Sequence, residues 1–180
     1  MSLLVPIVVM KQFVGADGTP STGSVTFTLT RNLLDPVDGE TVPAVPVKAL
    51  LDVTGVAAQQ LWANDVTGLE PPNTQYQVVE EVSGGQRSYF VTVPHAPPGS
   101  RTVTDGAVTQ GSALLSSATA AWTSADVGKY LAVPGVTPGV KVLRVTSGTA
   151  ATMTTAATAT GTGLSVVIGA EVSLTTLEPT

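Results

Sequence analysis

The stretch SVTFTLT (Ser24–Thr30) alternates without interruption between hydroxyl-bearing and apolar side chains. In an extended chain successive side chains point to opposite faces, so Val25, Phe27 and Leu29 share one face and the hydroxyls share the other. No segment of the chain keeps an apolar period of 3.6 residues over three turns, which an amphipathic helix requires. The pattern therefore predicts a half-buried strand here and an all-β fold for the chain.

The composition also favours short strands joined by turns. Apolar residues make up 43% of the 180-residue chain and charged residues 12%, and there are 18 Gly and 13 Pro. This apolar fraction can bury a core, whereas helices need more Glu, Lys, Arg and Leu. Further strands are expected at 45–51, 59–63, 76–82, 88–93, 113–116, 130–133, 141–145, 151–155, 165–168 and 172–175.

A proline-rich segment divides the chain. VPHAPPGS (Val93–Ser100) places three prolines in eight residues, which removes backbone donors and stiffens the chain. We therefore expect two small modules, each resembling a β-sandwich or a β-barrel. They are an Ig-like or prealbumin-like β-sandwich at 1–94, a Pro-rich linker at 95–101, and a small β-module rich in Thr, Val and Gly at 102–180.

The stretch TSADVGK in the second half predicts one helical turn followed by a strand. Thr123 or Ser124 is suited to the N-cap, and Gly128 to the left-handed position that ends the turn. Trp122 would then lie beneath the turn as a core residue. The Gly-Lys pair lacks the earlier glycine and the following Ser or Thr of a phosphate-binding loop, so the stretch is interpreted as structural.

The residues for common catalytic sites are absent or badly placed. The chain has no cysteine, which excludes disulfides, thiolate nucleophiles and thiolate metal sites. His95 is the single histidine, and it falls in the expected linker. Glu80 and Glu81 are adjacent on a predicted strand, so their carboxylates point to opposite faces and cannot flank one glycosidic bond. We expect no enzymatic activity and no cofactor.

One acidic loop offers a possible metal site. In DPVDGE, Asp35, Asp38 and Glu40 lie close together around a glycine, as in part of an oxygen-ligand calcium loop. The full calcium-loop spacing is not reached, so an ordinary acidic turn is the main interpretation. No metal is expected elsewhere.

The larger aromatic residues provide the candidate binding platforms. These are Trp62, Tyr76, Tyr89, Trp122 and Tyr130. Core packing accounts for most of them. Trp122 and Tyr130 are kept as possible contacts for a glycan or a partner.

The charge distribution argues against nucleic acid as a partner. The formal net charge is −5, and residues 1–100 contain 4 Lys or Arg against 9 Asp or Glu. Neither half clusters basic residues into the positive face that phosphate contacts require.

The apolar N-terminus MSLLVPIVVM is expected to be the first strand. No basic residue precedes it and no small-residue cleavage pattern follows, so we expect no signal peptide. About 20 helical residues are needed to cross a bilayer, and this run is too short. No membrane insertion is expected.

Several stretches of the first half resemble a module of known phage proteins. They are GADGTPSTGSVTFTLT, VPVKALLDVTG and PPNTQYQVVEEVSGGQRSYFVTVP. Their order resembles the N-terminal β-sandwich of tail-fibre and minor tail proteins of phages that infect actinobacteria. In the second half, an aromatic residue followed by TSADVGK, a strand and a Gly/Pro turn is similar to a small β-module of phage tail-spike and other virion proteins.

The resemblance implies a non-enzymatic virion structural protein, assembled in the host cytoplasm. The leading expectation is a short, homo-oligomeric, tail-associated appendage or adaptor, a trimer by analogy with phage appendages. The alternatives are a capsid decoration protein or head fibre, and a carbohydrate-binding module that contacts a host surface glycan. The expected partners are tail, baseplate or major capsid proteins. By analogy the first module docks and the second points outward or oligomerises.

Overall fold

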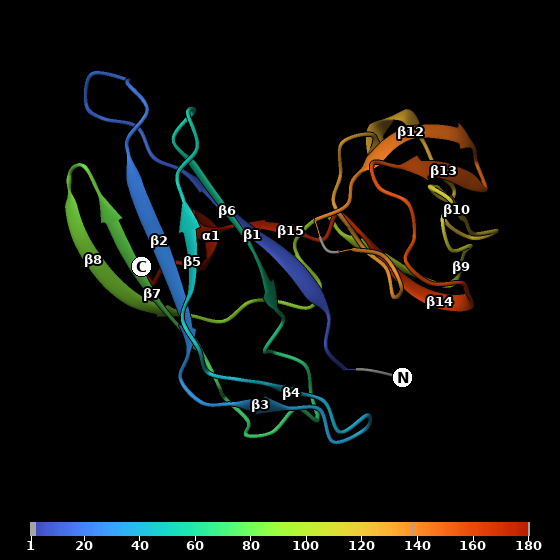
Figure 1. Cartoon of the computed structure of the whole chain (residues 1–180), viewed down its shortest axis with the longest axis horizontal. Helices are drawn as coiled ribbons and strands as arrows, with labels where there is room; N and C mark the ends of the chain where they lie inside the picture. Colours follow the sequence, from blue (N-terminus) through green and yellow to red (C-terminus); the bar gives the residue numbers. More distant parts are fainter. Residues whose placement is uncertain (1–2, 138, 180) are drawn as a thin grey trace. The chain divides into compact units, whose positions relative to one another are not determined.

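The regular secondary structure of the chain is almost all β, with 47% of residues in strands and 4% in helices, which confirms the all-β prediction. The computed structural model describes residues 3–137 and 139–179. It divides the chain into two compact units, unit 1 (Met1–His95 with Val172–Thr180) and unit 2 (Ala96–Glu171). Figure 1 shows the strands of both units.

The described residues of unit 1 form three β-sheets and a short C-terminal helix. Its elements are β1 (Pro6–Gln12), β2 (Gly23–Leu29), β3 (Leu33–Leu34), β4 (Thr41–Val42), β5 (Val47–Leu50), β6 (Val56–Trp62), β7 (Tyr76–Val82), β8 (Gly85–Val91), β15 (Glu171–Ser173) and α1 (Leu174–Leu177). One sheet has the order β5-β2-β7-β8, a second has the order β15-β1-β6, and β3 pairs with β4.

The two larger sheets of unit 1 face each other across a common core. The Tyr76 hydroxyl on β7 accepts a hydrogen bond from the Trp62 amide on β6 (3.1 Å) and donates to the Trp62 carbonyl (3.2 Å). Val25, Phe27 and Leu29 are all buried, as the alternation of β2 predicts. Unit 1 is therefore a β-sandwich whose strongest sequence pattern marks its inner face.

The C-terminal residues belong to unit 1. The chain leaves this unit after His95, and Val172–Thr180 returns to it, with β15 next to β1. This division differs from the expected one, which kept residues 172–180 in the second module. The strand expected at 172–175 is only partly found, because β15 ends at Ser173 and the next two residues begin α1. Pairing with β1 is a long-range contact, for which the local pattern of 172–175 carries no signal.

Unit 2 is a small, strongly curved antiparallel sheet. Its elements are β9 (Arg101–Val108), β10 (Leu114–Ser116), the 3₁₀ turn η1 (Ser124–Asp126), β11 (Leu131–Ala132), β12 (Val142–Ser147), β13 (Ala150–Met153) and β14 (Gly161–Ile168). The strand order is β11-β14-β9-β10-β13-β12. The two outer strands meet at an isolated bridge between Tyr130 and Lys141, and the Val142 amide donates to the Lys129 carbonyl at 3.0 Å. The sheet is therefore closed on itself like a barrel.

The core of unit 2 is small and apolar. Its buried members include Leu115, Trp122, Leu131, Met153 and Ile168, which come from several strands and the η1 turn region. The expected Pro-rich linker ends where β9 begins, at Arg101.

Candidate functional site

The stretch TSADVGK forms a capped corner of unit 2. Ser124–Asp126 makes a single 3₁₀ turn with Thr123 as N-cap, and the Asp126 carboxylate accepts a hydrogen bond from the Thr123 amide at 3.0 Å. Gly128 has a φ of 87°, the left-handed conformation that the sequence predicts at the end of the turn. The local sequence thus explains the local backbone.

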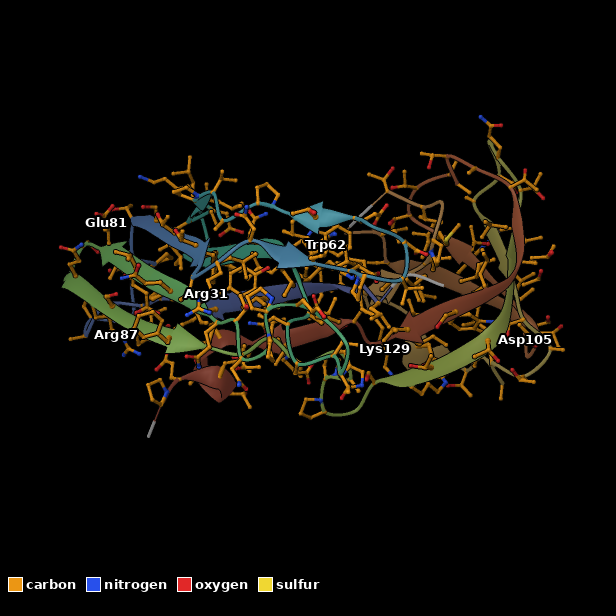
Figure 2. The ribbon with its side chains drawn as sticks, turned by 90° about the horizontal axis from the view of Figure 1, so that it is seen from below. Arg31, Trp62, Glu81, Arg87, Asp105 and Lys129 are labelled. Atoms are coloured by element: carbon orange, nitrogen blue, oxygen red, sulfur yellow. The ribbon has the colours of Figure 1, made fainter. Side chains whose placement is uncertain are left out.

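Asp126 is also the centre of a buried ion cluster, which we call the corner clamp. The two terminal nitrogens of Arg101 bind its two oxygens at 2.7 and 2.8 Å, and Lys129 Nζ lies 3.0 Å from Oδ1. The Arg101 hydrogen bonds are the largest influence on the pKa of Asp126, which they hold far below its usual range. Lys129, labelled in Figure 2, is therefore engaged with a carboxylate of its own unit.

The two aromatic candidates of unit 2 have different surroundings. Trp122 is only 4% exposed and belongs to the core, with the Arg101 guanidinium 5.8 Å from its ring centroid. Its ring is therefore a core element, as its position before the turn predicts, and it presents no platform to a glycan. Tyr130 is partly exposed, and Lys141 Nζ lies 4.3 Å from its ring centroid. Of the two residues, Tyr130 alone retains an accessible ring.

Unit 1 contains a second group of charges, the inter-sheet cluster, formed by Lys11, Glu80, Arg87, Tyr89 and Glu178. Lys11 Nζ binds Glu80 Oε1 at 2.9 Å and also contacts Glu178 Oε1. Arg87 binds Glu80 at 3.1 Å and Glu178 at 2.6 Å. The Tyr89 hydroxyl donates to Glu80 at 2.6 Å. Two cations thus balance two carboxylates.

The surroundings shift the pKa values of Tyr89 and Glu178 in this cluster. Burial raises the pKa of the Tyr89 phenol well above its usual value, and the hydrogen bond to Glu80 raises it further, so Tyr89 remains a donor. Burial also acts to raise the pKa of Glu178, but the hydrogen bonds from Lys11 and Arg87 outweigh it and keep the pKa below the usual range. The cluster therefore joins β1, β8 and the C-terminal segment as an ionic tie.

Glu80 and Glu81 point to opposite faces, as alternation predicts. Glu80 is 2% exposed and belongs to the inter-sheet cluster. Glu81 is exposed, and its nearest cation is Lys48 at 3.9 Å. The two carboxylates do not share a site.

The acidic loop DPVDGE does not assemble a metal site. Asp35 is fully buried, and its side chain accepts hydrogen bonds from the Leu3 amide at 2.6 Å and the Val37 amide at 2.9 Å. Within residues 3–137 and 139–179, no group of three His, Cys, Asp or Glu side chains is placed to hold a metal ion. Asp35, Asp38 and Glu40 therefore do not converge, because Asp35 turns inward to cap its own loop.

His95 has one close partner. Its amide donates to Asp65 Oδ1 at 2.7 Å, and its ring Nδ1 lies 3.0 Å from the same oxygen. The side chain is 53% exposed. Asp65 thus holds His95 at the point where the chain leaves unit 1.

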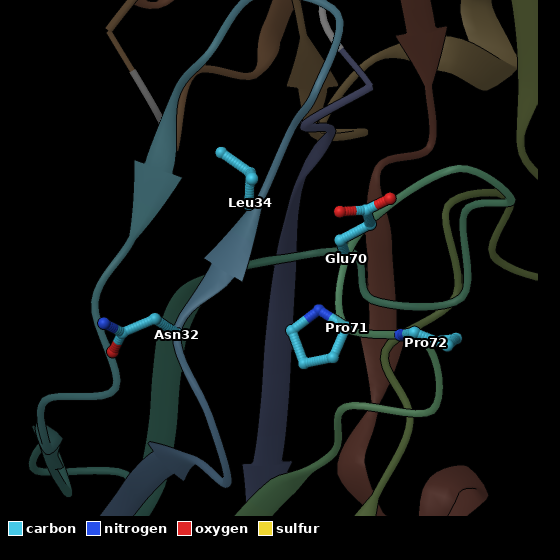
Figure 3. A pocket seen from close by; sticks show the side chains of 5 residues that line it. All are labelled: Asn32, Leu34, Glu70, Pro71 and Pro72. Atoms are coloured by element: carbon cyan, nitrogen blue, oxygen red, sulfur yellow. The ribbon is translucent and has the colours of Figure 1, made fainter.

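Two surface pockets lie on unit 1. One, of about 440 Å³, is lined by Asn32, Leu34, Glu70, Pro71 and Pro72. Figure 3 shows these side chains around the space beside β3. The other, of about 590 Å³, is a groove that lies against the β1–β2 loop and the β7–β8 turn. The first pocket is lined by one carboxylate, one carboxamide and two adjacent prolines.

Comparison with protein-family models, curated proteins and solved structures finds no match to this chain. In the part of the chain that the structure describes, no helix has the length and apolar character needed to cross a membrane.

Sequence reasoning did not find the two ion clusters. The patterns Y-x-V-x-E on β7 and R-x-Y-x-V on β8 place Glu80, Arg87 and Tyr89 on the inner face. These inward charges are a sequence signal from which the inter-sheet cluster could have been predicted. A charged residue at an inward position of a strand indicates a buried partner. Which partner it finds depends on tertiary contacts.

Proposed function

We propose that the chain is a non-enzymatic structural protein of a phage virion, a short tail-associated appendage or adaptor. The main support for this proposal is that the motifs which resemble virion modules form central structural features of each unit. In unit 2, TSADVGK forms the capped corner around Asp126. In unit 1, the β7–β8 motif supplies Glu80, Arg87 and Tyr89 to the inter-sheet cluster.

The way the charges are used supports the same proposal. Lys11, Arg87, Arg101 and Lys129 all bind carboxylates of their own unit. Such clusters fix the architecture of a module and leave these groups engaged. A protein that joins or decorates a particle needs stable modules with defined surfaces.

A homo-oligomer is part of the proposal. A module of fewer than about 100 residues buries only about 60–65% of its unfolded surface and gains stability from association. We expect a trimer, with the chain's partners being other virion proteins. Light scattering on the purified chain measures the mass; a monomer at micromolar concentration, both free and on the particle, would contradict this part.

Immunogold electron microscopy of intact virions tests the location. Antibodies raised against the purified chain avoid a C-terminal tag, which would lie close to Glu178 in its ionic tie. Gold along or at the end of the tail is the expected result. Gold spread over the head would replace the tail assignment with capsid decoration. Virions without gold, from a phage that encodes the chain, would contradict both.

Glycan binding is a further candidate at Tyr130, the partly exposed member of the aromatic pair. The test is a glycan array with wild-type chain and Tyr130→Ala. Binding that Tyr130→Ala abolishes supports a glycan contact, whereas binding retained by the variant removes this residue as the platform.

A further inference from the structure

Three loops of unit 1 meet at one end of the sandwich. They are the β1–β2 loop, the β5–β6 loop and the β7–β8 turn (Figure 1). The Phe13 amide donates to the Gly55 carbonyl at 2.9 Å, and the Ser83 amide donates to the Thr22 carbonyl at 2.9 Å. We call residues 13–22, 50–55 and 83–84 the loop end.

The β5–β6 loop is held in one shape by its own side chains. Asp52 accepts hydrogen bonds from the Thr54 amide at 2.8 Å, the Thr54 hydroxyl at 2.7 Å and the Val56 amide at 3.0 Å. Gly55 completes the turn at a φ of 75°, packed against the Phe13 carbonyl. Asp17 makes the same kind of turn in the β1–β2 loop. The loop end therefore presents a fixed surface.

This fixed surface is unusually apolar. Val53, at the tip of the β5–β6 loop, is 94% exposed, Leu50 is 73% exposed, and Val14 is 56% exposed. Folding does not require valine at position 53, because the Asp52 turn is made by its neighbours and leaves this side chain in solvent. Single exposed apolar residues are common, but a group on hydrogen-bonded neighbouring loops marks an interaction surface.

Of these side chains, Val14 also lines a groove. It has a volume of about 590 Å³ and is lined by 11–16, 21 and 82–84, which include Phe13, Val14 and Val82. The lining is formed by two of the three loops of the loop end and by the adjoining ends of β1 and β7. An apolar side chain of a partner would find both a projecting face and a recess.

The charges of the loop end have one sign. Asp17 and Asp52 are the ionisable side chains of residues 13–22, 50–55 and 83–84, and Lys11, which lines the adjoining groove, is paired with Glu80 and Glu178. Hydrogen bonds from Thr19 and Thr54 lower the pKa values of these carboxylates, so both stay ionised. A second copy of the same end would bring like charges together, whereas a basic surface is complementary.

We propose that the loop end is the docking surface of unit 1, and that its occupant is a basic and apolar patch on a neighbouring virion protein. This inference rests on the proposed function. Apolar contact with Val14 and Val53 supplies most of the affinity, and the two aspartates orient the partner.

Binding of the purified full-length chain to particles tests the proposal. The particles come from the encoding phage with a nonsense mutation in this gene, and bound chain is quantified after sedimentation. The test variant is Val14→Ser with Val53→Ser. The matched control is Val37→Ser with Val45→Ser, since these valines are 57% and 55% exposed elsewhere in unit 1. Circular dichroism checks that both variants are folded.

We expect the Val14/Val53 variant to bind about tenfold more weakly or worse, because two apolar contacts are lost. The Val37/Val45 control should bind within about twofold of wild type, as expected for surface changes outside an interface. Wild-type binding should also weaken with added salt.

Each remaining outcome overturns a defined part of the account. If wild type binds and the Val14/Val53 variant binds equally well, the loop end is not the docking surface although the proposed function stands. If the control loses as much binding as the test variant, the effect is not specific to the loop end. If wild-type chain does not bind the particles, the proposed function fails and the docking surface with it.

Discussion

Both units enclose a buried carboxylate, but the two carboxylates find their partners at different distances along the chain. Asp126 in unit 2 binds Arg101, 25 residues away, and Lys129, three residues away. Glu80 in unit 1 binds Tyr89, nine residues away, but also Lys11, 69 residues away, and Lys11 contacts Glu178, 167 residues from it.

This difference shows how each unit is completed. Unit 2 is one continuous segment, Ala96–Glu171, and all members of its corner clamp lie within it. Unit 1 is made from two segments, and its inter-sheet cluster includes a residue close to the C-terminus. We therefore expect unit 2 to be independent of the chain end and unit 1 to depend on it.

The two units can be followed separately. Trp62 lies in unit 1 and Trp122 in unit 2, and these are the chain's two tryptophans. Replacing either one by phenylalanine leaves a single fluorescent reporter. The unfolding transitions of both single-tryptophan chains, in denaturant, provide the measurement for the next three predictions.

The largest expected effect comes from ending the chain at Glu171. This removes Val172 and Leu174, which are 5% and 1% exposed, together with Glu178. Each buried apolar side chain contributes about 1.5–3 kcal/mol, so unit 1 should lose about 4 kcal/mol or more, or fail to fold. The Trp122 transition of unit 2 should stay in place. An unchanged Trp62 transition would show that unit 1 is complete without the chain end.

The second largest effect is expected for Asp126→Ala. This change leaves Arg101 and Lys129 without their carboxylate and removes the acceptor of the Thr123 amide. Breaking a buried pair costs about 3–5 kcal/mol, and the partial exposure of both cations reduces this to about 3. Only the Trp122 transition should shift. The matched change Asp105→Ala removes hydrogen bonds from Ser117 and Thr119 but no ion pair. If both changes have the same effect, the ion pairs of the corner clamp add nothing.

A smaller effect is expected for Glu178→Gln, which keeps the size of the side chain and removes its charge. The ion pairs with Lys11 and Arg87 are partly exposed, so the loss in unit 1 should be about 1 kcal/mol. Glu81→Gln is the control, because Glu81 is 52% exposed and lies 3.9 Å from Lys48. A control effect as large as that of Glu178 would mean that general surface charge, rather than the tie to the chain end, is being measured.

Unit 2 should also lose stability in acid. Hydrogen bonds from Ser117 and Thr119 lower the pKa of Asp105 to about 2, and the pKa of Asp126 is lowered as well. Because the folded-state pKa is lowered, the ionised carboxylate stabilises the fold fully above the ordinary pKa of 3.8. This stabilisation is lost as the pH falls through about 2. Burial raises the pKa of Glu171, so protonation of Glu171 in acid stabilises the fold and partly offsets this loss.

Chemical denaturation of unit 2, followed by Trp122 fluorescence at pH 6, 4, 3 and 2, measures this response. Stability should be nearly constant down to about pH 4 and then decline. In Asp126→Ala the decline should be shallower. A steady decline that begins near pH 6 would assign the response to other groups.

The sequence predicts the parts of the fold that local patterns control. Alternation places Val25, Phe27 and Leu29 inside β2, and the strand expected at 76–82 coincides with β7. The turn after Thr123 and the left-handed Gly128 follow from capping preferences. In these places the local and tertiary structures favour the same conformation.

Long-range features were not predictable. β9 was missed, because its first residues adjoin the prolines of the expected linker and Asp105-Gly106 suggests a turn. The placement of β15 beside β1 depends on a sheet edge formed far away in the sequence. Residues 35–40 form the expected acidic turn, but the inward direction of the Asp35 side chain, which removes it from the weak metal-site candidate, depends on a tertiary contact with the Leu3 amide.

The most direct test of the central claim is the protein content of purified particles of the encoding phage. Gradient-purified virions are analysed by quantitative mass spectrometry, and the chain is compared with the major capsid protein across the gradient fractions. We predict a fixed ratio of chain to capsid protein in every particle fraction. A chain found only in the soluble fraction of the lysate, and absent from infectious particles, would contradict a virion structural role.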